Sequence, residues 1–238
     1  MRARRLVRGG RTAVDTRAMR PWETLASVVT PEGLLELRRR SEHDWLITIA
    51  GRILMTSVQH RSEDALAVLA CKGLRADARV LVSGLGMGFT LRAALSALGP
   101  AARVEVAELN EVVVAWCRTW LAPLTLHAAL DPRVTVAVED VALSIARAAK
   151  EGPAFDAIVL DMYEGPQAKV ADDHPLYGVR ALARTRTALV PRGVLTVWCE
   201  SASAGFDRAL RKAGFEATSH REGRGARTFL VVRAVRVG

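Results

Sequence analysis

The chain has 238 residues, half of them hydrophobic, and a formal net charge of +9 at pH 7. This length and composition predict one α/β domain with a short extension, and no apolar run reaches the roughly 18 residues of a membrane span. Residues 1–20 hold seven arginines against one aspartate and carry +6 of the charge. The rest of the chain is only mildly basic, which makes nucleic acid an unfavoured partner.

We interpret residues 1–20 as a disordered basic tail, since they lack apolar periodicity and the hydrophobic core of a signal peptide. A phosphate-binding arm is the alternative. The three cysteines, Cys71, Cys117 and Cys199, stand far apart in apolar surroundings and show no metal-ligand spacing. They predict buried reduced thiols, a cytoplasmic protein and no metal.

The segment 21–60 predicts a small N-terminal β unit. Strand patterns occupy Gly33–Arg40 and Trp45–Leu54, with Gly51 as a turn residue. A helix is expected over Ser62–Cys71, where Ser62 is placed to cap it and the acids that follow favour its positive end.

From residue 61 to 238 the pattern predicts a Rossmann-like domain that binds a cofactor and performs catalysis. Apolar strands are expected at Arg79–Ser83, Arg103–Ala107, Arg133–Val138, Phe155–Leu160 and Gly193–Cys199. Helical patterns fall between and after them, at Thr90–Leu98, Glu111–Leu121, Val141–Lys150, Tyr177–Leu189 and Ala204–Ala213. This alternation indicates a parallel sheet covered on both faces.

The last two strand patterns, Phe215–His220 and Thr228–Val235, are too close for a crossover helix and predict an antiparallel hairpin at one sheet edge. The fold class is therefore α/β, with a mostly parallel seven-stranded sheet. Five parallel strands followed by a closing hairpin are the arrangement of class I methyltransferases and their relatives.

A glycine loop follows the first of these strands directly and opens a helix. Gly84, Leu85, Gly86 and Gly88 are expected to bind a cofactor, because glycines permit a sharp turn and a close backbone approach. The alternative is a purely structural role, in which the glycines only form a tight strand-to-helix turn and bind no ligand.

Acids at the ends of the next three strands strengthen the cofactor interpretation. Glu108 is placed to accept both ribose hydroxyls, Asp140 to accept from an adenine amino group, and Asp161 to face the same crevice. Each could instead cap a helix, but the series favours one adenosine site. S-adenosylmethionine, or its decarboxylated form, is the expected cofactor. A nicotinamide cofactor is the nearest competitor, but the chain has no room for the separate substrate domain that would go with it.

The stretch from Arg79 to about Glu200 resembles the spermidine synthase family. The matching segments read VLVSGLGMGFTLRAAL, VAELNEVVV, DPRVTVAVEDV, FDAIVLDMYEGP and PRGVLTV. The resemblance implies that Glu108 and Asp140 hold ribose and adenine and that Asp161 orients and deprotonates the attacking amine. It also implies a second substrate-binding acid at Glu164 and a homodimer formed through the N-terminal strands.

The sequence departs from that family at its amine-binding positions. Met87 stands where the family's glycine loop has an aspartate that anchors the donor amine, and Leu66-Ala67 replace Tyr followed by His or Gln. Because these changes remove polar anchors for ammonium groups, we expect a methyltransferase acting on an amine or another small nucleophile. The alternatives are a polyamine aminopropyltransferase and, from another class, a non-catalytic adenosine-binding module.

In either transferase the enzyme mainly positions a nucleophile in line with a carbon on a sulfonium. Asp161, Tyr163 and Glu164 are the expected catalytic group, with Tyr163 packing over the adenosine as an alternative. His60, Asp173 and Tyr177 are expected to form a gate for a small-molecule substrate. Core packing is expected for Trp116, Trp120 and Trp198.

Overall fold

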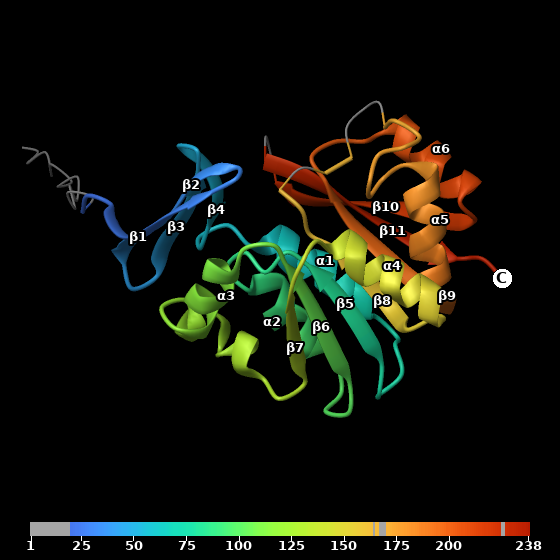
Figure 1. Cartoon of the computed structure of the whole chain (residues 1–238), viewed down its shortest axis with the longest axis horizontal. Coiled ribbons are helices and arrows are strands. Elements are labelled where there is room, and N and C mark those ends of the chain that lie inside the picture. The colour runs from blue at the N-terminus through green and yellow to red at the C-terminus, as the bar shows by residue number, and fades with distance from the viewer. Residues whose placement is uncertain (1–19, 164, 167–169, 225–226) are drawn as a thin grey trace, which may run out of the picture.

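The computed structural model describes residues 20–163, 165–166, 170–224 and 227–238. These residues form an N-terminal four-stranded sheet and a larger seven-stranded sheet flanked by helices (Figure 1). All but the last residue of the predicted basic tail lies outside the described residues, so its interpretation stays a prediction.

The N-terminal sheet is an antiparallel meander of β1 (Glu23–Thr30), β2 (Gly33–Ser41), β3 (Asp44–Ile49) and β4 (Arg52–Thr56). The sequence patterns predicted two strands here. The second pattern is divided by a turn at Ala50 and Gly51, whose φ angles of 47° and 76° reverse the chain. β1 was not predicted, because most of its residues are exposed and carry no clear alternation of apolar and polar side chains.

The seven-stranded sheet confirms the predicted fold class. Its strands are β5 (Arg79–Ser83), β6 (Arg103–Glu108), β7 (Val134–Val138), β8 (Phe155–Leu160), β9 (Leu189–Cys199), β10 (Phe215–Arg224) and β11 (Arg227–Arg236). The order is β10-β11-β9-β8-β5-β6-β7, with β5 to β9 mutually parallel and the last two strands antiparallel. The strand order therefore reverses at β5, where the glycine loop begins, and such switch points are where α/β sheets bind ligands.

Helices cover both faces of this sheet. Side chains of α1 (Arg61–Cys71), α2 (Phe89–Ala97) and α3 (Glu111–Arg118) share one apolar core, and those of α4 (Val141–Glu151), α5 (Val179–Ala188) and α6 (Ala204–Lys212) share another. Val80 and Val82 of β5 lie in the first core and Leu81 in the second, as expected when successive strand side chains alternate between faces.

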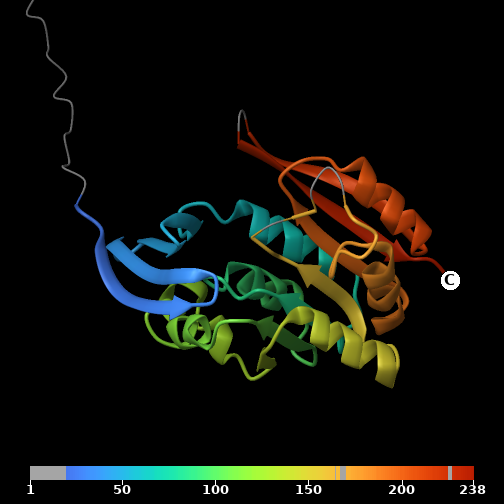
Figure 2. The ribbon, with the colours of Figure 1, turned by 45° about the horizontal axis from the view of Figure 1, so that its top comes forward.

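The N-terminal sheet belongs to the first of these cores. Leu35, Leu37 and Ile47 are fully buried and lie in the same cluster as Leu66 of α1. Figure 2 shows this sheet beside α3, near the ends of the central strands. The sheet is thus held over one end of the larger sheet, where the strands deliver their acids.

Most helix ends match the predictions within two residues, but two details differ. Ser62 does not cap α1: the cap position is His60, whose side chain makes no capping hydrogen bond to the helix backbone. α3 stops at Arg118 because the chain continues as a 3-10 turn over Ala122–Thr125 with a proline near its start.

All three cysteines are free and buried, as predicted, and burial raises the pKa of Cys71 and of Cys199 to about 12. Trp116 is buried in the core as expected, whereas the prediction for Trp120 is wrong, since 45% of it is exposed. Among the described residues, every helix is too short or too polar to cross a membrane.

Candidate functional site

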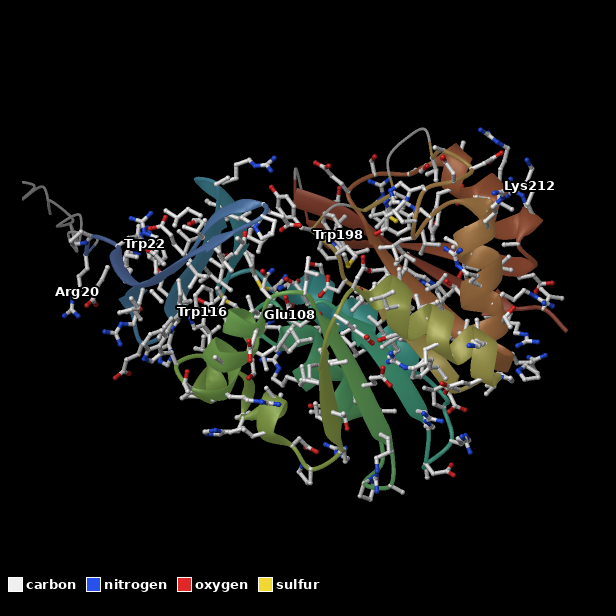
Figure 3. All side chains as sticks on the ribbon, viewed as in Figure 1. Arg20, Trp22, Glu108, Trp116, Trp198 and Lys212 are labelled. Atoms are coloured by element: carbon white, nitrogen blue, oxygen red, sulfur yellow. The ribbon has the colours of Figure 1, made fainter. Side chains whose placement is uncertain are left out.

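A cavity of about 830 Å³ lies at the carboxyl ends of β5, β6, β7 and β8, and the N-terminal sheet forms part of its wall. Its size is in the range of cofactor and ligand sites. In Figure 3, Glu108 of β6 and Trp198 of β9 lie between the two sheets. The lining includes acids from three of the central strands and apolar side chains from the N-terminal sheet, among them Leu35, Ile47, Ile49 and Met55.

The glycine loop forms one wall of this cavity. Gly84, Gly86 and Gly88 have φ angles of 74°, 51° and 88°, which residues with a Cβ rarely adopt. A Cβ on Gly84 would lie 2.7 Å from the backbone oxygen of Asp161, so glycine is required where the loop crosses the end of β8. Leu85, by contrast, is buried and supports the loop from behind.

Glu108 is buried beside this loop. Its carboxylate accepts hydrogen bonds from the backbone N–H of Leu85, at 2.7 Å, and of Asn110, at 2.8 Å. Since each carboxylate oxygen has two lone pairs, Glu108 holds the loop in shape and still has acceptor capacity facing the cavity.

Asp140 also lines the cavity, at the start of α4. Its carboxylate accepts from the N–H of Ala142 at 2.8 Å, which makes it the N-cap of that helix. Asp140 therefore caps α4, as the alternative interpretation expected, and it also lines the cavity.

Asp161 follows the last residue of β8 and faces the cavity. Its carboxylate accepts a hydrogen bond from the hydroxyl of Thr90 in α2. Burial, and repulsion from the Glu63 carboxylate, raise the pKa of Asp161 to about 7, although the Thr90 hydrogen bond opposes the shift. A carboxyl group with a pKa near neutrality can accept or release a proton under ordinary conditions.

Glu63 is a cavity residue that the sequence interpretation missed. It lies in the first turn of α1, is only 8% exposed, and lines the cavity with Ser62. Its burial raises its pKa, while a hydrogen bond from the Ser62 hydroxyl lowers it. The sequence offered an explanation for an acid at a helix start, namely the helix dipole, and so gave no reason to look further.

Two of the remaining predicted residues, Tyr163 and Tyr177, line the cavity. Tyr163 lines the cavity and is 45% exposed, with the guanidinium of Arg52 5.8 Å from its ring centroid. Tyr177 also lines it, buried between His174 and Phe206. Glu164 lies outside the described residues.

Two predicted gate residues lie elsewhere in the described structure. The His60 ring stacks on Phe89, with centroids 4.3 Å apart, and its Nδ1 is 2.8 Å from a carboxylate oxygen of Asp64. Asp173 is exposed, and neither His60 nor Asp173 lines the cavity. A gating role for either one stays a prediction without geometric support.

No group of three His, Cys, Asp or Glu side chains within the described ranges is arranged to hold a metal ion.

Comparison with known proteins gives one consistent result. The chain is 31% identical over 116 residues to the polyamine aminopropyltransferase of Pyrobaculum calidifontis and 30% identical over 92 residues to that of Pyrobaculum islandicum. These matches cover 49% and 39% of this chain, and the chain spans only 39% and 31% of the lengths of those relatives. No protein-family model matches the chain.

Solved structures agree with the sequence matches on the fold. The spermidine synthase of Thermotoga maritima superposes with a TM-score of 0.71 at 18% identity, over 90% of this chain and 72% of that one. A spermidine synthase in complex with the transition-state analogue AdoDATO gives a TM-score of 0.70 at 17% identity, with the same coverage. The resemblance to the spermidine synthase family is thus confirmed.

The preference for a methyltransferase is wrong, because the matched relatives are polyamine aminopropyltransferases. That preference relied on Met87, Leu66 and Ala67 as lost anchors. All three are fully buried, and none lines the cavity of the described chain. These three side chains therefore form no part of the cavity wall, whereas Glu63 supplies a carboxylate there.

Proposed function

We propose that this chain is a polyamine aminopropyltransferase, which moves the aminopropyl group of decarboxylated S-adenosylmethionine to an amine acceptor. The observation that carries the proposal is the meeting of the glycine loop, Glu108 and Asp161 on one cavity, where the Asp161 carboxyl has a pKa of about 7. The relatives with this activity support the same assignment.

The residues fit the adenosine part of the donor. Gly84 and Gly86 bring loop backbone to the cavity wall, and Glu108 retains acceptor capacity for ribose hydroxyls. Asp140 lies one strand further along for the adenine amino group. The half-buried Trp198 and the apolar side chains of the N-terminal sheet supply the non-polar remainder of the wall.

The reaction is a displacement at the propyl carbon attached to sulfur. A C–N bond forms between the acceptor nitrogen and this carbon, the C–S bond breaks, and sulfur keeps the electron pair to leave as the thioether of methylthioadenosine. The acceptor ammonium must first lose a proton, because only the neutral amine has the electron pair that attacks the carbon. The nitrogen then takes over the positive charge of the sulfonium, and the secondary ammonium formed can keep it. Asp161 is the acid placed to orient this nitrogen and to accept its proton.

The pKa of Asp161 suits that task. At pH 7 to 8 a large share of the carboxyl is ionised and can accept a proton, yet it is a stronger base than an ordinary aspartate. Thr90 donates to the carboxylate and fixes its orientation, and the backbone carbonyl of Asp161 packs against Gly84. These two contacts fix the position of the proposed catalytic carboxylate relative to the loop that would bind the donor.

A product assay tests the proposal. The purified chain with decarboxylated S-adenosylmethionine and 1,4-diaminobutane should form methylthioadenosine and spermidine in equal amounts, measured by liquid chromatography and mass spectrometry. Asp161→Asn should lower turnover by about 100-fold or more while methylthioadenosine binds with nearly the wild-type Kd. Absence of methylthioadenosine from the wild-type reaction, or full turnover by Asp161→Asn, would contradict the proposal.

A further inference from the structure

The cavity contains a further buried acid, Glu63, besides Glu108 and Asp161. Glu63 comes from the first turn of α1, whereas Asp161 comes from the end of β8, and both line the same cavity. They are close enough for their charges to interact, since repulsion from Glu63 is one cause of the raised pKa of Asp161. The fold thus brings two carboxyl groups from different elements to the wall of one cavity.

Neither acid is neutralised by the protein. In the parts of the chain that the structure describes, Asp161 accepts from the Thr90 hydroxyl, and Glu63 accepts from the Ser62 hydroxyl and from its own backbone N–H. His60 also lowers the pKa of Glu63, but it does so less than burial raises it. No lysine or arginine forms a salt bridge with either of them there. The neighbouring Asp64 differs, because it pairs with Arg92 at 2.6 Å and with His60 at 2.8 Å.

Two uncompensated carboxylates in a desolvated site are costly, because each loses hydration and repels the other. A cation from outside the chain relieves both costs. A primary ammonium has three N–H donors and one positive charge, so it can donate to both acids at once. Asp161 has a role as proton acceptor in the proposed reaction, which leaves Glu63 as the acid that can pair with a cation throughout. Burial raises the pKa of Glu63, and a bound ammonium would favour its ionised form.

We propose that Glu63, together with Asp161, forms the binding site for a primary ammonium group of a substrate, with Glu63 as the residue that selects for it. This inference rests on the proposed function, in which both the donor and the acceptor carry primary amines. The ammonium belongs either to the aminopropyl arm of the donor or to the far end of the acceptor.

Calorimetry on the full chain separates these sources. The probes are methylthioadenosine, which has no ammonium, decarboxylated S-adenosylmethionine, which has one, and 1,4-diaminobutane added after methylthioadenosine. Glu63→Gln keeps the shape of the side chain and removes its charge. Asp64→Asn is the matched control, since it removes a charge from the same turn of α1 at a residue that does not line the cavity.

Glu63→Gln should bind methylthioadenosine like the wild type. It should bind one of the two amine-bearing probes about 10- to 100-fold more weakly, the range expected for loss of a charge-assisted hydrogen bond. Weaker binding of decarboxylated S-adenosylmethionine assigns the site to the donor, and weaker binding of 1,4-diaminobutane assigns it to the acceptor. Asp64→Asn should change none of the three.

Unchanged affinity of Glu63→Gln for both amine-bearing probes would overturn the inference. Equal losses for all three probes would also overturn it, because they would mean a general disturbance of the cavity. Glu63→Asp, which keeps the charge, should recover part of the lost affinity, and thermal unfolding of each variant verifies that it is folded. A wild-type chain that fails to bind methylthioadenosine would reject the proposed function instead.

Discussion

At the scale of single residues, Asp161 determines how the proposed activity responds to pH. Its carboxyl must be ionised to accept a proton, and its pKa is raised to about 7. The value of kcat/KM should therefore rise with pH through about 7 and level off above it. The charged group that raises this pKa is Glu63 on α1, and the group that lowers it is the Thr90 hydroxyl on α2.

Glu63→Gln should move this inflection to lower pH, because it removes the negative charge that repels ionised Asp161. The ionisation of the acceptor amine is the same for both proteins, so the difference between the two pH profiles isolates the effect on Asp161. An inflection that stays in place in the variant would mean that Glu63 does not act on Asp161 electrostatically.

Much of the site followed from local sequence patterns. The glycine loop, Glu108, Asp140 and Asp161 were predicted because parallel strands end at the same edge of a sheet. The three acids line one cavity together with Gly84 and Gly86, whereas Leu85 and Gly88 of the loop do not line it. Glu63 could not be predicted in this way, since only tertiary packing of α1 brings its side chain to the same cavity as Asp161. His60 was placed near the site by sequence proximity, but its ring stacks on Phe89 instead.

At the scale of elements, the N-terminal sheet is part of the main core. Leu37 of β2 is fully buried in the cluster that also contains α1 and α2. Leu37→Ala should lower the free energy of unfolding by about 2–5 kcal/mol, the usual cost of emptying a core leucine site. Val29→Ala in β1, where the side chain is 83% exposed, should change it by less than about 0.5 kcal/mol.

Urea unfolding followed by circular dichroism and tryptophan fluorescence measures both variants. Coincident transitions are expected from the two probes, since Trp45 in β3 and Trp116 in α3 lie in the same core. Separate transitions, with Leu37→Ala affecting only the first, would show that the N-terminal sheet unfolds independently.

The sequence predicted elements well where burial is continuous and poorly where it is not. β5 and β8 have the predicted bounds, because every residue of β8 and nearly every residue of β5 is buried. β1 has no such pattern, and the turn at Ala50-Gly51 is short enough that β3 and β4 read as one strand. Strands paired at a surface depend on their partners, which a local pattern does not describe.

At the scale of the whole molecule, the cavity exists because two sheets meet. The central sheet supplies the loop and the acids, and the N-terminal sheet supplies apolar wall residues that shield them from water. Exclusion of water strengthens each electrostatic contact made with a substrate. The homodimer and the cytoplasmic location stay predictions, and the chain spans less than half the length of the aminopropyltransferases it matches.

The central claim is that one nucleoside is held by the glycine loop, Glu108 and Asp140 with its sulfur end directed to Asp161. A crystal structure of the chain with methylthioadenosine tests this most directly. The ribose hydroxyls should lie within about 3 Å of Glu108 oxygens, the adenine amino group beside Asp140, and the sulfur on the Asp161 side of the cavity. A nucleoside bound elsewhere, or bound here with its sulfur directed away from Asp161, would contradict the account.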